Sequence, residues 1–324
     1  MVQLILEVAL QNLTSPPVLA FALGLIAVAV KSDLRLPEAV YQTLSIYLLL
    51  GIGIKGGVAL SEANLAEVLL PLIGTLLLGV LVPALAFLVL GLVKKLDTSN
   101  RGALAAHYGS TSLVTFTAAL IFLEAQKIPV EGYVTTLLAI MEIPGILIGL
   151  LLASRGLNRD VNWKESLNEV LTGRSIVLLA GGLGIGLVTA ASGYARIEPF
   201  FGGLFTGVLT LFLLEMGIVA GRRIPDIKIV GWPLIAFGIG FPIISGSLGV
   251  WTGQLVGMSI GGSAVLGVLA ASASYIAAPA AVRLALPEAS PGIYLTASLG
   301  ITFPFNLVVG IPIMLAISQA LGGL

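Results

Sequence analysis

The sequence predicts an all-α integral membrane protein with ten transmembrane helices, arranged as a five-plus-five inverted repeat. Three observations predict this class. Hydrophobic residues make up 57% of the 324 residues and charged residues only 10%, a composition suited to lipid rather than water. The charges gather in short segments between apolar stretches long enough to cross ~30 Å of hydrocarbon. A pattern of glycine and small polar residues also occurs once in each half of the chain.

Ten apolar spans fit between the charged segments. Between Lys228 and Arg283, for example, 54 residues carry no charge, enough for two helices of ~20 residues each. The predicted spans cover 16–30, 37–54, 68–93, 102–123, 132–153, 175–194, 199–220, 229–256, 262–285 and 292–318. Their ends are defined to within a few residues, as is usual for bounds taken from sequence.

The positive charges predict the orientation of these spans. With the N-terminus outside the cytoplasm, 13 of the 16 Lys and Arg residues fall in inner loops, and only Lys55, Lys127 and Arg196 fall in outer ones. This bias follows the positive-inside rule. An odd number of spans per half gives the halves opposite orientations. We therefore expect a multi-pass protein with both termini outside, a first repeat over 1–153, a cytoplasmic linker over 154–173 and an inverted repeat over 174–324.

The repeated pattern lies in spans four and nine. Gly-Ala-Leu-Ala-Ala at 102–106 precedes Gly109-Ser110-Thr111-Ser112, and Gly-Val-Leu-Ala-Ala at 267–271 precedes Ser272-Ala273-Ser274-Tyr275, with Pro279 close behind. Glycine and proline interrupt helices, and in a membrane the freed backbone groups must face a cavity or a partner. The N-terminus of a half-helix suits an anion, whereas freed carbonyls and hydroxyls suit Na⁺. Small residues of this kind are also ordinary at packed helix interfaces, so the matched pair carries the prediction of a small-anion and sodium site.

One acidic residue falls at the middle of a predicted span. Glu142 lies in Met-Glu-Ile-Pro-Gly of span five, where a carboxylate costs ~3 kcal/mol near the membrane centre and is a functional candidate by default. It could bind a cation or carry a proton, or lie at the surface if the span begins later. Thr302, with Asn306 nearby, holds the matching place in the second half. Lys55, at the end of span two, is interpreted as a snorkelling residue.

Several function classes are excluded by composition. The chain has no cysteine and one histidine, which removes thiolate and multi-histidine metal sites. The net charge is zero, so no basic surface predicts nucleic-acid binding. No catalytic triad, phosphate-binding loop or nucleotide motif is present. We therefore expect a protein that is not an enzyme and has no cofactor, with Na⁺ as a coupling ion.

Four motifs resemble the sodium-dependent bicarbonate transporters of cyanobacteria and their bacterial relatives over nearly the whole chain. They are the segments 51–57, 109–111, 141–144 and 272–279. The resemblance implies import of bicarbonate with Na⁺ by alternating access at the plasma membrane. It also implies core and gate domains that move against each other, and a homotrimer. The best-known members bind a small trimeric cytosolic regulator of the PII type.

The resemblance implies a site where the two broken helices meet. Its substrate-binding residues match Gly109, Ser110, Thr111, Ser272 and Ser274, and its sodium-binding residues match Glu142, Ser112, Thr302 and Tyr275. Three features depart from the best-known members. An acidic residue stands there in place of Tyr275, Glu142 replaces an aspartate, and the linker is shorter. Loss of a fixed negative charge at 275 weakens cation binding or changes the number of coupled sodium ions.

Two alternatives stay open at this point. The first is a sodium- or proton-coupled carrier of another small organic anion, because bicarbonate itself follows from the resemblance alone. The second is a passive anion channel or a membrane sensor. A channel would equilibrate its substrate without accumulating it, and a sensor would bind the anion without flux.

Overall fold

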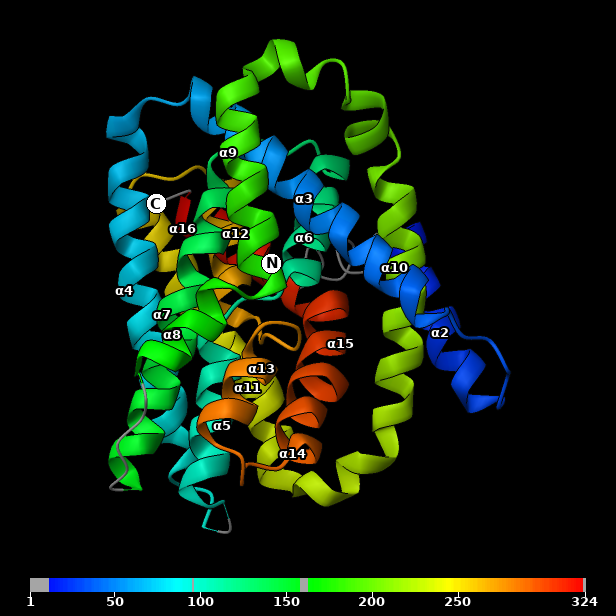
Figure 1. Ribbon diagram of the computed structural model, residues 1–324, viewed down its shortest axis with the longest axis vertical. Helices are drawn as coiled ribbons and strands as arrows, with labels where there is room; N and C mark the ends of the chain where they lie inside the picture. The colour runs from blue at the N-terminus through cyan, green and yellow to red at the C-terminus, as the bar shows by residue number, and fades with distance from the viewer. Residues whose placement is uncertain (1–11, 95, 158–162, 323–324) are drawn as a thin grey trace.

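The computed structural model describes residues 12–94, 96–157 and 163–322, and within these ranges it is helical with no β-strand. The helices form a tall bundle (Figure 1). Parts of the predicted domain division, namely both chain ends and 158–162 of the linker, lie outside the described residues, as does the location of the termini. The helical class predicted from the sequence is confirmed for the described part of the chain.

The helices follow the predicted spans closely. In the first half they are α2 (Pro16–Ala29), α3 (Glu38–Glu62), α4 (Leu65–Leu90), α5 (Thr98–Gly109), α6 (Leu113–Ala125) and α7 (Val134–Gly156). A short amphipathic helix, α8 (Trp163–Leu171), lies in the predicted linker. The second half holds α9 (Arg174–Tyr194), α10 (Phe205–Arg223), α11 (Ile227–Leu255), α12 (Ile260–Ala271), α13 (Ala278–Ala285), α14 (Pro291–Leu295), α15 (Phe303–Phe305) and α16 (Ile311–Gly322). Short π-helical turns connect the last three, at Thr296–Thr302 and Asn306–Gly310.

Eight helical segments of the described chain are long and apolar enough to cross a membrane. Two further apolar helices, α2 and α12, are shorter. The 14 residues of α2 reach only ~21 Å at 1.5 Å per residue. The chain is therefore a multi-pass membrane protein by helix length and composition, while the count of ten spans and the inverted-repeat layout remain predictions.

Helix starts are set by capping side chains. Asn64, Asp97 and Ser259 each accept a hydrogen bond from a backbone N–H in the first turn of α4, α5 and α12, respectively. Such caps satisfy amide groups that have no partner within the helix. The register of the helices that carry the candidate site is fixed in this way.

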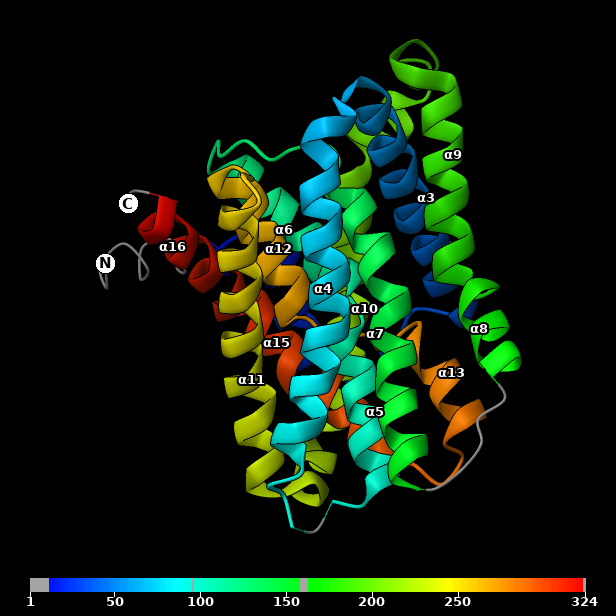
Figure 2. The same ribbon diagram turned by 90° about the vertical axis from the view of Figure 1, so that its left-hand side faces the viewer.

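The helices pack in two groups. In the first group, α3 packs along α9, α2 packs along α10, and α10 also contacts α3. Glycines allow the closest approach, since Gly53 and Gly57 of α3 face Gly182 and Gly186 of α9 without intervening side chains, a usual way for membrane helices to associate. The second group contains α4, α5 and α7 together with α11, α12 and α16. Figure 2 shows α3 and α9 along one side of the molecule and α11 and α12 along the other.

Candidate functional site

Two helices are interrupted at the repeated pattern. The first helix stops with α5 at Gly109 and resumes with α6 at Leu113, and the second stops with α12 at Ala271 and resumes with α13 at Ala278. Both stop in the same way, because Ser110 (φ −92°, ψ 167°) and Ser272 (φ −84°, ψ 164°) are extended. Serine at these places ends the helix without strain, since both conformations lie in the broad β region.

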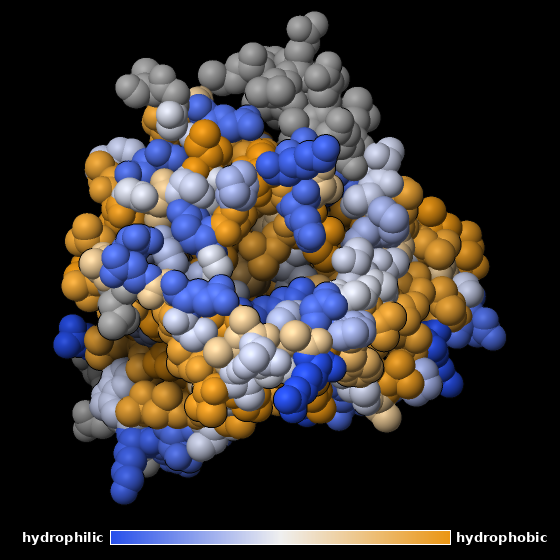
Figure 3. Space-filling view, turned by 90° about the horizontal axis from the view of Figure 1, so that it is seen from above, coloured by the Kyte–Doolittle hydropathy of each residue, from blue (hydrophilic) through white to orange (hydrophobic). Residues whose placement is uncertain are grey.

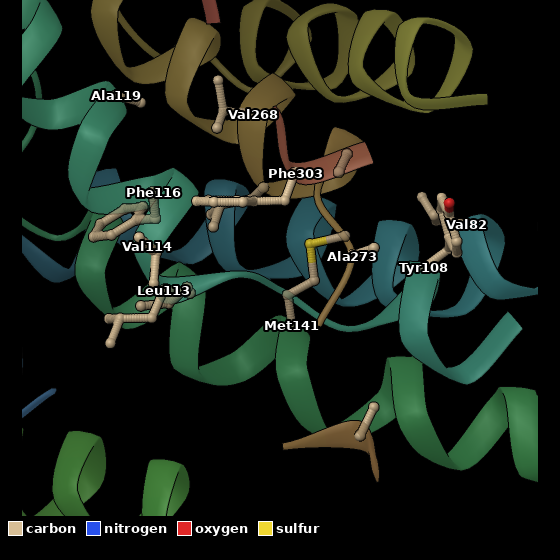
Figure 4. Packing of buried hydrophobic residues seen from close by; sticks show 14 of the residues in the cluster. Val82, Tyr108, Leu113, Val114, Phe116, Ala119, Met141, Val268, Ala273 and Phe303 are labelled. Carbon is tan, nitrogen blue, oxygen red and sulfur yellow. The ribbon is translucent and has the colours of Figure 1, made fainter. Parts of the chain in front are cut away.

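The two interruptions lie against each other. The Ser112 amide donates to the Ser272 hydroxyl at 2.9 Å, and the Ser274 amide donates to the His107 carbonyl at 2.8 Å. Figure 4 shows the extended segment between Tyr108 and Leu113 crossing the segment around Ala273, with Met141 of α7 beside the crossing. Each bond pairs a backbone group that the broken helix has left free, so the crossing satisfies the backbone in the membrane interior.

A serine hydroxyl accepts from backbone amides near the start of each resuming half-helix. The Ser112 hydroxyl accepts from the Thr115 amide at 3.3 Å and lies 2.9 Å from the Thr115 hydroxyl. The Ser274 hydroxyl lies 3.3 Å from the amides of both Ala277 and Ala278. The positive ends of α6 and α13 therefore start at one place in the molecule.

A narrow cavity of about 10 Å³ lies at these helix starts, room for about one water molecule or one small ion. The lining residues are Leu49, Thr111, Ser112, Leu113, Glu142, Ser175, Ser274, Tyr275, Ile276 and Ala277. Leu49 and Ser175 come from α3 and α9, whereas the others come from α7, the start of α6 and the two interruptions. The cavity therefore lies at the boundary between the two groups.

Glu142 supplies the acidic side chain of this cavity. It is 4% exposed, and among the described residues no hydrogen bond or ion pair joins its carboxylate to a partner. The helix that carries it is pressed against the first interruption, since a side chain at Gly145 would overlap the backbone of Gly109. A buried carboxylate without a protein partner is costly unless a cation or a proton neutralises it.

Five residues predicted from the sequence meet in the cavity: Thr111, Ser112, Glu142, Ser274 and Tyr275. The Tyr275 hydroxyl is buried and has no hydrogen-bond partner among the described residues. The predicted sodium ligands Glu142, Ser112 and Tyr275 thus share one space, and their role in sodium binding stays a prediction.

The other predicted residues lie away from the cavity lining. Gly109 packs against α7, and the buried Ser110 hydroxyl has no partner in the described chain. The Ser272 hydroxyl already accepts from Ser112 and donates to the Leu269 carbonyl at 2.8 Å. These residues shape the backbone of the interruptions.

Thr302 is held in a different environment. Its hydroxyl donates to the Gly238 carbonyl at 2.7 Å and lies 2.6 Å from the Tyr108 hydroxyl. Pro242 lies four residues after Gly238 within α11 and has no N–H to donate, so the Gly238 carbonyl would otherwise lack a helical partner. The geometry gives Thr302 a structural bond, and a role in sodium binding stays a prediction.

Five lining residues were not predicted from the sequence. Leu113, Ile276 and Ala277 adjoin predicted residues, whereas Leu49 and Ser175 lie on other helices. Leu49 lies within a run of three leucines, and nothing in that run distinguishes it from its neighbours. Ser175 follows Arg174 at the start of α9, where a serine is typical of any helix N-terminus. Only the packing of α3 and α9 against the second group brings these side chains to the cavity.

The chemistry of the lining suits both a small cation and an anionic group. Hydroxyl and carboxylate oxygens suit a hard cation such as Na⁺, and two half-helix N-termini suit an anion. Among the described residues no group of three or more His, Asp or Glu side chains could hold a metal ion.

Comparisons with known proteins identify the family. No individual curated protein matches the chain significantly. A family model described as the Na⁺-dependent bicarbonate transporter superfamily matches residues 16–319, nearly the whole chain and all of the cavity lining, and it confirms the resemblance noted in the motifs. The chain therefore belongs to the Na⁺-dependent bicarbonate transporter superfamily.

Proposed function

We propose that this protein imports bicarbonate together with Na⁺ by alternating access. The observation that carries the proposal is the Glu142 carboxylate, which is buried at the interrupted helices without a protein partner. Family membership supports the substrate class, and the lining of the cavity supports a cation site beside the two half-helix N-termini.

In this proposal Na⁺ binds at Glu142. The hydroxyls of Ser112 and Tyr275 line the same cavity, and their oxygens complete a ligand set for a hard cation. Thr302 is the weaker candidate, because its hydroxyl is engaged by Gly238 and Tyr108. Binding of Na⁺ removes the cost of the buried negative charge, so the cation and the folded site stabilise each other.

The anion binds at the starts of α6 and α13, close to the sodium. The hydroxyls of Thr111 and Ser274 and the N–H groups of the two half-helices are the proposed donors, with Gly109, Ser110 and Ser272 shaping the backbone. A bound Na⁺ raises the affinity for an anion beside it by direct attraction. This attraction is the physical basis of the proposed coupling.

The cavity also supports alternating access. At about 10 Å³ it is too small for a bicarbonate ion of four heavy atoms, so the anion requires a more open arrangement. Leu49 and Ser175 line it from the first helix group, and a displacement of that group would widen it. We propose the first group (α2, α3, α9 and α10) as the gate domain and the second as the core domain.

We also propose three properties that the family resemblance implies. They are a plasma-membrane location with both termini outside, a homotrimer, and binding of a PII-type regulator from the cytosol. Mass measurement of the purified protein in detergent tests the trimer.

Proton coupling is the alternative that the same observation supports, because a proton would neutralise Glu142 as well as Na⁺ does. Uptake of radiolabelled bicarbonate into proteoliposomes, with external Na⁺ or with choline in its place, separates the two. Sodium coupling predicts accumulation only with Na⁺, whereas accumulation in choline under a proton gradient would contradict it.

A further inference from the structure

A second cavity, of about 320 Å³, lies between the two helix groups. It is lined by Ile52, Lys55, Leu120, Ile121, Glu124, Thr135, Glu198, Gly202, Gly203, Phe205 and Thr206. It lies toward the end of the molecule at which α3 and α9 finish, which the charge distribution predicts to be the outer end. Figure 3 views that end, where the surface is hollowed near its centre and hydrophilic residues surround the hollow.

Lys55 is the cation of this cavity. Its side chain is partly buried, and its Nζ lies 4.8 Å from the centre of the Phe205 ring. Among the described residues no carboxylate forms an ion pair with it. Glu124 and Glu198 line the same cavity but are exposed at its rim. The ammonium group therefore has the Phe205 ring on one side and no carboxylate within ion-pair distance, although Glu124 and Glu198 attract it from farther off across the cavity.

The position of Lys55 differs from that of a snorkelling lysine. A snorkelling side chain extends its charge into bulk water along an apolar surface, whereas Lys55 lines a cavity between helices. The residues flanking Lys55 are Gly53, Gly56 and Gly57, which face α9 or Thr135. Because they have no side chains, they do not cover the ammonium group. A partly desolvated ammonium in a concave space attracts an anion more strongly than one in bulk water.

The two cavities lie at different heights along the same helix, α3. Leu49, Ile52 and Lys55 follow each other at intervals of three residues, so Ile52 is a neighbour of both on the surface of α3. Leu49 lines the first cavity and Lys55 the second, about 9 Å apart along the helix axis at 1.5 Å per residue. Leu49 and Ile52 are 1% and 2% exposed, so apolar side chains separate the two spaces.

We propose that the Lys55 cavity is a second anion-binding site, which takes a small oxyanion such as bicarbonate before it reaches the interrupted helices. The order of the two sites during import rests on the proposed function. Anion binding at Lys55 rests on the cavity alone. Lys55 holds the anion as a point charge through charge-assisted hydrogen bonds. The rim carboxylates Glu124 and Glu198 attract the Na⁺ that must arrive with it. A moderate affinity suits this site, because the anion has to leave it again.

The test is Lys55→Gln in the full-length protein, with Arg196→Gln as its control. Arg196 is an exposed residue of the same predicted outer side, so its substitution removes the same charge without touching the cavity. We expect Lys55→Gln to raise the KM for bicarbonate uptake by about tenfold with Vmax within about twofold of the wild type, as for loss of one charge-assisted bond. Lys55→Arg keeps the charge and should restore the KM to within about threefold of the wild type.

Two results overturn the site. One is a KM for Lys55→Gln that matches Arg196→Gln, because the effect would then be long-range or nil. The other is a Lys55→Arg variant as weak as Lys55→Gln, because the lysine would then act through packing.

Equilibrium binding separates this inference from the proposed function. If the wild type does not accumulate bicarbonate, the proposed function fails, and calorimetric titration with bicarbonate, nitrate and formate still tests the cavity. Weaker binding of one of these anions to Lys55→Gln than to Arg196→Gln supports the site. Equal binding to both variants, or no binding of any of the three to the wild type, overturns it.

Discussion

Replacing Ser272 with alanine removes a hydroxyl that joins the two interrupted helices. That hydroxyl accepts the Ser112 amide at 2.9 Å and donates to the Leu269 carbonyl at 2.8 Å. The Leu269 carbonyl keeps a partner, because the Ser272 amide also donates to it at 3.2 Å. The Ser112 amide loses its acceptor inside the protein, where Ser112 is 4% exposed.

The expected cost follows from this count. One buried amide left without an acceptor costs ~1–3 kcal/mol, and interhelical hydrogen bonds in membrane proteins tend toward the lower values. We expect Ser272→Ala to destabilise the protein by ~1–2 kcal/mol, which lowers the folding equilibrium constant by roughly 5- to 30-fold.

The matched control is Ser245→Ala. Ser245 is similarly buried, at 1% exposed, but its hydroxyl donates within its own helix, to the Phe241 carbonyl at 2.9 Å and weakly to the Pro242 carbonyl at 3.5 Å. This local bond duplicates one that the helix backbone already makes, so its loss should cost less than ~0.5 kcal/mol. Unfolding of both variants in mixed micelles of increasing denaturing detergent gives the two free energies. Equal destabilisation of Ser272→Ala and Ser245→Ala would refute the idea that Ser272 pins the interruptions together.

Further predictions concern the sodium site, the hydrogen bond between Thr302 and the Gly238 carbonyl, and the packing of α3 on α9. Glu142→Gln should abolish the dependence of uptake on the Na⁺ gradient. Glu215→Gln, which keeps an oxygen that accepts the Leu36 amide, should retain this dependence. Sodium-dependent uptake by Glu142→Gln would contradict the site. Thr302→Val should lower the free energy of unfolding by ~1–3 kcal/mol, since the partners of its hydroxyl are left unpaired. Thr302→Ser should be close to wild type, and the KM for Na⁺ should be unchanged in both variants. A raised KM would instead place Thr302 in the sodium site. Gly186→Ala should reduce the yield of folded protein on size-exclusion chromatography, because its Cβ would overlap the Ile54 carbonyl, while Gly181→Ala, which meets nothing within 4 Å, should behave as wild type; equal yields would show that α3 and α9 separate at little cost.

The sequence predicts the helices well because hydrophobic length and turn residues are local properties. Span four was predicted over 102–123, and the chain is helical over Thr98–Gly109 and Leu113–Ala125, with its interruption at the predicted Gly-Ser-Thr-Ser. The short helix α8 lies within 154–173, the segment predicted as a linker. In both cases neighbouring residues alone determine the outcome, through capping and helix breaking.

Side-chain partners could not be predicted in the same way. Thr302 was predicted as a sodium ligand and Asn306 was noted only as its polar neighbour. In the structure Thr302 pairs with a carbonyl freed by Pro242, and the Asn306 side-chain amide donates to the last carbonyl of α12, Ala271, at 2.7 Å. Both bonds join residues distant in sequence, so they depend on how the helices pack. The contribution of Leu49 to the cavity has the same origin, because the packing of the two helix groups selects one leucine from a run.

The π-helical turns at Thr296–Thr302 and Asn306–Gly310 were also not predicted. Such turns are commonly found near functional sites, but they have no sequence pattern comparable to a proline or a glycine pair. Here they bring Thr302 and Asn306 to α11 and α12, respectively.

The most direct test of the proposed function is uptake of ¹⁴C-bicarbonate by purified protein in liposomes, with and without an inward Na⁺ gradient, at a pH where CO₂ is a minor species. Liposomes without protein and liposomes with Glu142→Gln serve as controls. The proposal predicts accumulation above the external concentration only when the Na⁺ gradient is present and Glu142 is intact. Equilibration without accumulation, or accumulation independent of Na⁺, would contradict it.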